Sequence, residues 1–112
     1  MIFSDERHKK TYYAILAKMH AFDAYHASYA YLISLIDAPA HDCFDFQYDK
    51  VKRDVVNQDW VSGTDFRVLT LALNLWNPNN PADVSEVFSY VGPKFADYLF
   101  EAIKIRFEHF SL

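Results

Sequence analysis

Glycine, cysteine and long apolar runs are scarce in this chain of 112 residues, and each scarcity excludes a class of protein. It has only 2 glycines among its 112 residues, whereas glycine makes up about 7% of an average protein. A glycine-rich phosphate-binding loop is therefore excluded. Cys43 is the single cysteine, which excludes an intrachain disulfide and is typical of a reducing compartment. The longest apolar stretch, residues 29–36, is far shorter than the ~20 residues of a membrane-spanning helix, and Asp5 and Glu6 lie where a signal peptide would be basic. We therefore expect a cytoplasmic protein that does not enter a membrane.

Positive charge is also scarce. The chain has 11 lysine and arginine residues against 15 aspartate and glutamate residues, which gives a net charge of −4. Proteins that bind nucleic acids usually carry a basic excess or a basic stripe. The two basic clusters here, residues 7–10 and 50–53, are short and have acidic residues beside them. The sequence therefore disfavours binding to nucleic acids.

Aromatic residues, by contrast, are abundant: the chain has 10 Phe, 8 Tyr and 2 Trp. Hydrophobic residues make up 52% and charged residues 23%, which is ordinary for a globular protein, so residues 1–112 are expected to form a single helical domain. One small core does not easily enclose so many rings, each of which buries ~150–250 Å². Because tyrosine is enriched at binding hot spots, the tyrosines expected to be half-exposed favour a protein-binding surface; they are Tyr12, Tyr13, Tyr25, Tyr29, Tyr31, Tyr90 and Tyr98.

Apolar residues recur at spacings of three and four over much of the chain, which predicts helices. Ser4, Asp23 and Ser62 are suitable N-terminal caps, and Asp65 gives Ser62 the spacing of a capping box. Two further starts are predicted where Asn80 and Gly92 each precede a proline, because proline suits the first helical position. The predicted helices cover residues 5–19, 24–37, 63–76, 81–90 and 94–109.

Spacing also predicts which faces of these helices are buried. The helix at residues 63–76 is apolar on nearly all sides, which predicts that it is the buried centre of the fold. The helix at residues 94–109 is expected to turn Phe107 and Phe110 inward and Glu101 toward water.

The helix at residues 24–37 carries a stripe of small side chains, formed by Ala27, Ala30 and Ser34. Such a stripe lets another helix approach closely. Together with the surplus of tyrosines, it indicates close helix contacts, of which a contact between two chains is one alternative. We predict a homodimer.

Residues 40–61 form the least helical segment. Phe44, Phe46 and Tyr48 alternate with polar residues, which is the period of a β-strand, although a short helix after residue 50 fits equally well. The predicted fold class is therefore mainly α: a compact single-domain bundle of about five helices, with room for a short β-hairpin around residues 44–53.

The C-terminal half carries a pattern that resembles a known family. The pattern consists of LALNLWN at residues 71–77, VF at residues 87–88 and EAIKIRF at residues 101–107, with WVSG at residues 60–63 before the central helix. It resembles a family of small bacterial and phage proteins known only as a domain of unknown function, most clearly over residues 44–107. The resemblance implies a compact, mostly helical unit and a mobile-element context, and it brings no catalytic residue.

Three groups of polar residues have spacings that also occur in catalytic or metal sites. His20, Asp23 and His26 are three residues apart, but a helix break between them favours a helix cap with surface histidines over a metal site. His41 lies close to Cys43, but neighbouring residues usually point apart, so a loop thiol is favoured over a nucleophile. The third group consists of carboxylates on the last predicted helix. Such a row of acidic side chains is typical of a helix face that is exposed to water. We therefore expect no metal ion and no cofactor.

A line of polar side chains runs along the central predicted helix: Arg67, Thr70, Asn74 and Asn77. Polar groups on such a helix must be hydrogen-bonded or exposed, so they either hold the following loop or line a small pocket. The guanidinium of Arg67 suits a carboxylate or phosphate. Asn77 is expected to end the helix and to direct the loop.

These features favour a small non-enzymatic protein that binds a protein partner, or itself, through an aromatic-rich helical surface. One alternative, which rests on the resemblance, is an inhibitor of a host defence protein carried by a phage or mobile element. The other is a small enzyme with a site near Arg67 and Asn74, or near His20 and His26. The candidate binding residues are Arg67, Thr70, Asn74, Asn77, Tyr25 and Tyr29.

Overall fold

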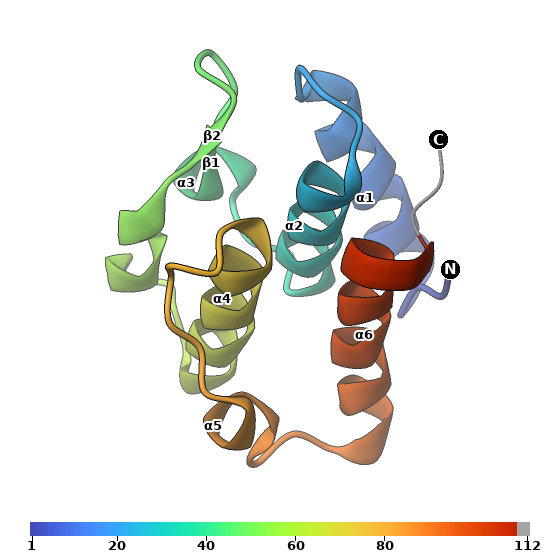
Figure 1. Ribbon diagram of the computed structural model, residues 1–112, viewed down its shortest axis with the longest axis vertical. Coiled ribbons are helices and arrows are strands. Elements are labelled where there is room, and N and C mark those ends of the chain that lie inside the picture. Colours follow the sequence, from blue (N-terminus) through green and yellow to red (C-terminus); the bar gives the residue numbers. More distant parts are fainter. Residues whose placement is uncertain (110–112) are drawn as a thin grey trace.

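The computed structural model describes residues 1–109, which fold into helices with one small hairpin, as predicted (Figure 1). No helix in this part of the chain is both long and apolar enough to cross a membrane. The elements in chain order are α1 (Glu6–Lys18), α2 (Ala24–Leu35), α3 (Ala40–Cys43), β1 (Phe44–Asp45), β2 (Lys50–Val51), the 3₁₀ helix η1 (Arg53–Asn57), α4 (Gly63–Trp76), α5 (Val84–Phe88), α6 (Pro93–Lys104) and the π-helix η2 (Ile105–His109).

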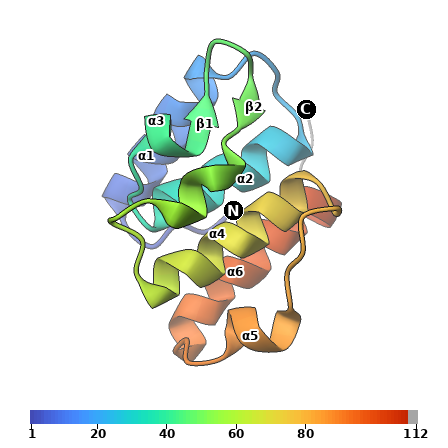
Figure 2. The same cartoon turned by 90° about the vertical axis from the view of Figure 1, so that its left-hand side faces the viewer.

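Helix α2 lies at the centre of the fold. Every residue from His26 to Leu35 is buried, and α1, α4 and α6 pack around this helix (Figures 1 and 2). The prediction that residues 63–76 form the centre was wrong. The polar line on α4 leaves one side of that helix partly exposed, whereas the apolar and small side chains of α2 face every direction.

Three tyrosines that were expected to be half-exposed are instead buried, so the prediction was wrong for Tyr12, Tyr29 and Tyr31. The Tyr29 hydroxyl donates to the Cys43 carbonyl at 2.7 Å, and the Tyr31 hydroxyl donates to the Ile2 carbonyl at 2.7 Å. A buried tyrosine is tolerated when its hydroxyl finds such a partner. The prediction of at least partial exposure is confirmed for Tyr13, Tyr25, Tyr90 and Tyr98.

The small-residue stripe on α2 is covered by the chain itself. Ala27, Ala30 and Ser34 are fully buried, and the Ser34 hydroxyl donates to the Ala30 carbonyl at 2.7 Å. The stripe therefore serves packing within one chain, which is the close helix contact that its small side chains predicted. Homodimer formation by another surface stays a prediction.

Most helix starts agree with the caps expected from the sequence. Asp23 caps α2, and Ser62 and Asp65 make both hydrogen bonds of a capping box at the start of α4. Helix α1 is capped by Asp5, one residue later than predicted. Gly92 precedes α6, where proline holds the first position.

The helices near the C-terminus differ more from the prediction. Helix α5 is short and is capped by Asp83, because Asn80 turns its side chain into the protein instead. Glu101 is 6% exposed rather than facing water, since the N-terminal segment covers it and brings the Met1 amino group to 3.9 Å. Phe107 is 65% exposed rather than inward, because the chain changes there to a π-helix with a different period. Phe110 lies outside the described residues.

The predicted hairpin is present, with antiparallel strands that pair Phe44 with Val51 and Asp45 with Lys50. Neither glycine has a positive φ. The left-handed backbone positions are taken by Asp37, Asp49 and Tyr90, and aspartate tolerates this conformation better than most residues do.

Candidate binding groove beside helix α4

The polar line on α4 divides into two parts, and the C-terminal part holds a loop. The Asn74 side chain donates to the Asn80 carbonyl at 2.8 Å, and the Asn80 side chain donates to the Leu73 carbonyl at 3.0 Å. Asn80 is 7% exposed, so these bonds satisfy polar groups inside the protein. The sequence left two roles open for Asn74, to hold the following loop or to line a pocket. Its side chain holds the loop that follows α4.

Asn77 ends α4 in an extended conformation with φ −147° and not in the left-handed conformation common at this position. Its neighbour Pro78 explains the choice, because the residue before a proline is pushed toward extended backbone. The Asn77 carboxamide oxygen accepts from the Asn79 amide at 2.9 Å. This bond turns the chain toward Asn80.

The other part of the line borders a groove on the surface. One hollow of about 430 Å³ lies between α4 and α5, and another of about 380 Å³ lies between α4 and η1. Both are lined by Phe66, Thr70 and Pro81, so they adjoin along the exposed side of α4. We call them together the α4 groove; its other lining residues are Arg53, Asp54, Val56, Arg67, Leu73, Asn80, Ala82, Asp83, Glu86 and Val87.

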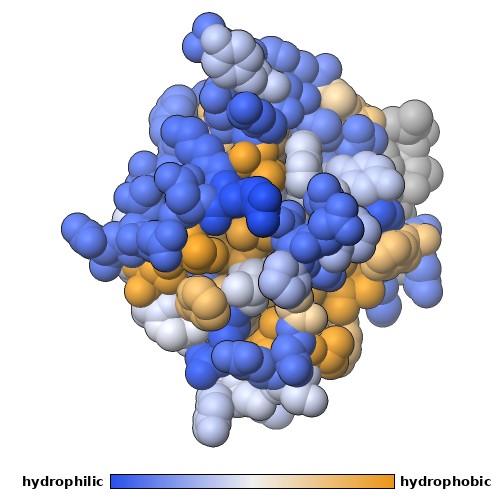
Figure 3. All heavy atoms as spheres, turned by 60° about the vertical axis from the view of Figure 1, so that its left-hand side comes forward, coloured by the Kyte–Doolittle hydropathy of each residue, from blue (hydrophilic) through white to orange (hydrophobic). Residues whose placement is uncertain are grey.

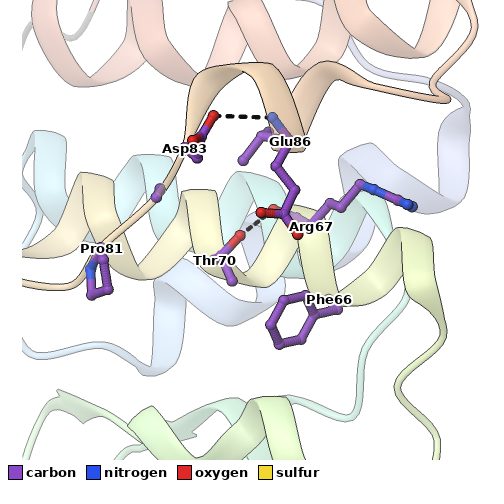
Figure 4. Close-up of a pocket in the computed structure, with 8 residues that line it drawn as sticks. Phe66, Arg67, Thr70, Pro81, Asp83 and Glu86 are labelled. Atoms are coloured by element: carbon purple, nitrogen blue, oxygen red, sulfur yellow. Dashed lines mark hydrogen bonds between the residues drawn. The ribbon is translucent and has the colours of Figure 1, made fainter.

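Apolar surface is exposed in this groove. The Phe66 ring, which is 43% exposed, lies on the side of α4 that faces away from α5 (Figure 4). The space-filling view shows that apolar patches on this side of the molecule lie between hydrophilic ones (Figure 3). A groove with an exposed aromatic ring and a polar rim is the usual form of a site for a partner's side chain.

Charged side chains surround the groove. The Arg67 guanidinium points away from Thr70, and its Cζ lies 5.3 Å from the centroid of the Tyr90 ring, while Glu86 extends from α5 over the hollow (Figure 4). Tyr90 is 92% exposed and has a φ of 63°, which is costly for a tyrosine. Within residues 1–109, no salt bridge is formed by the acidic lining residues Asp54, Asp83 and Glu86.

The group of His20, Asp23 and His26 joins the start of α2 to the hairpin turn by hydrogen bonds. The two ring nitrogens of His26 lie 2.8 Å from carboxylate oxygens, Nδ1 from Asp23 and Nε2 from Asp49. Carboxylates accept hydrogen bonds, so each ring nitrogen of His26 lies within hydrogen-bond distance of an acceptor. His20 takes part through its backbone amide, which donates to Asp49 at 3.0 Å. Asp49, which no motif singled out, joins the hairpin turn to the start of α2.

The aspartates of this group are held in their charged form. Burial alone raises the pKa of Asp23, but hydrogen bonds from the His26 amide and ring outweigh it, so the pKa is lowered overall. Burial likewise raises the pKa of Asp49, and the hydrogen bonds from the His20 amide and the His26 ring lower it by more. The negative charges of Asp23 and Asp49 thus favour their hydrogen bonds with His20 and His26.

Cys43 is unsuited to act as a nucleophile. Its side chain is fully buried, and burial is the main cause that raises the pKa of the thiol to about 12. A nucleophilic cysteine needs an accessible thiolate. In the part of the chain that the structure describes, no three His, Cys, Asp or Glu side chains come together to hold a metal ion.

The two tyrosines proposed for binding have different surroundings. Tyr29 is fully buried, so a direct role in binding is wrong for it. Tyr25 is 43% exposed, and its ring lies under the guanidinium of Arg106, with 3.9 Å from Cζ to the ring centroid. Sequence reasoning missed Arg106, because helices far apart in the chain bring the two residues together.

Comparisons with curated proteins and with solved structures gave no match. The resemblance first seen over residues 44–107 extends along nearly the whole chain, since a family profile matches residues 1–111. The chain therefore belongs to DUF6075, a family of unknown function.

Proposed function

We propose that this chain is a small non-enzymatic protein-binding module whose α4 groove takes a short segment of a partner protein. The observation that carries the proposal is the junction of the two hollows at Phe66, Thr70 and Pro81, where the Phe66 ring is exposed. An apolar ring beside a hollow gains free energy when a partner's side chain removes it from water.

Charge suggests the chemistry of the partner segment. The lining has three acidic residues and two arginines, and Glu86 extends over the hollow beside α5 (Figure 4). The whole chain has a net charge of −4. We therefore expect a segment with an apolar anchor for the Phe66 side and a lysine or arginine facing Glu86.

Selection from a displayed library of random peptides tests this function without knowledge of the natural partner. We expect the selected peptides to combine an aromatic or aliphatic residue with a nearby basic residue. Phe66→Ala and Glu86→Lys should each weaken their binding about tenfold, which corresponds to ~1.4 kcal/mol, as measured by calorimetry on purified protein.

The matched control is Tyr13→Ala, which removes an exposed aromatic ring from α1, outside the groove. This variant should bind the selected peptides like the unaltered protein. Equal weakening by Tyr13→Ala, or unchanged binding in Phe66→Ala and Glu86→Lys, would contradict the assignment of the groove.

A further inference from the structure

Arg106 is fixed in place at the end of the molecule where α2 begins and α4 ends. Its Nε donates to the Leu75 carbonyl at 2.9 Å, which satisfies one of the open carbonyls in the last turn of α4. Its Cζ lies 3.9 Å from the centroid of the Tyr25 ring and 4.6 Å from that of the Phe107 ring. A hydrogen bond and two aromatic rings thus hold the guanidinium in one orientation.

The two terminal nitrogens of this guanidinium carry N–H groups that can donate hydrogen bonds to a ligand. Arginine carries five N–H donors, of which the bond to Leu75 uses one. Among residues 1–109, neither terminal nitrogen of Arg106 makes a hydrogen bond or a salt bridge.

Arg7 shows the contrasting, structural use of the same side chain. Its terminal nitrogens donate to the carbonyls of Ser34 and Leu35, and Nη1 also lies 3.3 Å from the Asp37 carboxylate. Arg106 is equally well positioned, but its terminal nitrogens have no such acceptors in the described chain.

The two rings in contact with the Arg106 guanidinium are open to solvent. Tyr25 is 43% and Phe107 is 65% exposed. Tyrosine and arginine are the residues that most often dominate binding energy at protein interfaces, and a side chain held in its bound geometry loses little entropy on binding. The terminal nitrogens of arginine match the two oxygens of a carboxylate.

We propose that Arg106, Tyr25 and Phe107 form a binding site for a carboxylate group of a partner protein that lies next to an aromatic or apolar side chain. The carboxylate binds the two terminal nitrogens of Arg106, and the apolar side chain packs on the exposed rings. This Arg106 site shares no residue with the α4 groove, so either can be correct without the other.

The test compares two small probes that have the same ring, one with a charged carboxylate and the other with a neutral carboxamide in its place. N-acetyl-L-phenylalaninate has the carboxylate and the ring, and N-acetyl-L-phenylalaninamide has the ring but no charge. In NMR titrations of the whole chain, we expect the acid to shift the Arg106 Nε–H signal and the ring signals of Tyr25 and Phe107. The amide should bind about tenfold more weakly, the size of one charge-assisted hydrogen bond.

Two variants connect this binding to the proposed residues. Arg106→Lys keeps the charge but loses the paired donors, and Phe107→Ala removes an exposed ring, so each should weaken the acid about fivefold to tenfold. Tyr13→Ala is the matched control for Phe107→Ala, because it removes another exposed aromatic ring, on α1 and outside both sites, and it should leave binding of the acid unchanged.

Three outcomes would overturn the proposal. Equal binding of acid and amide would show that the carboxylate is not recognised, and this comparison needs no variant to fold. Full binding by Arg106→Lys would exclude the arginine. Inorganic phosphate that binds as tightly as the acid would show a general anion site in place of one that also recognises the neighbouring ring.

Discussion

His8 and His26 are both buried, but their ring nitrogens have different hydrogen-bonding partners. The His8 ring accepts a hydrogen bond from the Ser4 amide at 3.1 Å through Nδ1, and its Nε2 donates to the Tyr31 carbonyl at 2.9 Å. One donor and one acceptor fit the neutral ring. His26 has two carboxylates as partners, and both are acceptors of hydrogen bonds. The same residue type is thus used in two ways, and its partners alone decide which.

The comparison also shows why a spacing of histidines and aspartates is a weak sign of catalysis. The spacing of His20, Asp23 and His26 in the sequence also occurs in metal sites, yet the structure uses this group to join the start of α2 to the hairpin turn at Asp49. His8, which no motif singled out, joins α1 to α2 through Tyr31. Both histidines therefore serve the fold in the described structure.

The largest effect is expected from His8→Ala. The substitution leaves a cavity at a fully buried position and removes the partners of the Ser4 amide and the Tyr31 carbonyl. We expect a loss of about 3 kcal/mol in the free energy of unfolding, measured by urea denaturation. A loss below about 1 kcal/mol would show that His8 is not part of the core.

A smaller effect is expected from Asp49→Asn, which removes one of the two charges that face His26. We expect a loss of about 1.5 kcal/mol in the free energy of unfolding, the size of a hydrogen bond to a charged group. Asp59→Asn is the control, since Asp59 is an exposed aspartate. An equal loss in both variants would contradict the special pairing of Asp49 with His26.

The smallest effect is the dependence of stability on pH that His8 causes. Burial lowers the pKa of His8, although the hydrogen bond with Tyr31 acts in the other direction. The unfolded chain takes up a proton at this histidine near its ordinary pKa of about 6.5, before the folded chain does. At this histidine the unfolded state therefore binds more protons as the pH falls through this range, and the contribution of His8 to stability should decrease from about pH 7 toward pH 5.

Urea denaturation at a series of pH values measures this decrease. His8→Asn should be less stable overall but should show a flatter profile between about pH 7 and pH 5. The lowered pKa values of Asp23 and Asp49 act in another range: they stabilise the fold above the ordinary carboxyl pKa, and this contribution is lost as the pH falls below about 4. An unchanged slope near pH 6 in His8→Asn would show that another group causes it.

Local features of the fold could be read from the sequence because neighbouring residues determine them. Asp23 caps α2, Ser62 and Asp65 form the capping box of α4, and the alternation from Phe44 onward marks a strand. Each of these depends on backbone geometry within a few residues. The prediction failed where the partner was remote, as for Tyr29, whose hydroxyl bonds the Cys43 carbonyl.

The candidate sites show the same division. Arg67 and Thr70 were found in the sequence because they share one side of a helix, and they do border the α4 groove. Asn74 lies on the same side, but its side chain is used by the loop at Asn80. Phe66 and Glu86 were missed, since only the return of the chain from α4 to α5 brings them to one hollow.

The sequence by itself determined the helical class, most helix starts, the hairpin and the family. These follow from hydrophobic period, capping residues and proline positions, which act over one or two turns of the chain. Tertiary structure alone decided that α2 is the centre, that His8 is neutral in the core and that Arg106 contacts the rings of Tyr25 and Phe107. Burial and the charge state of a side chain depend on groups brought close by folding, and no local pattern specifies those groups.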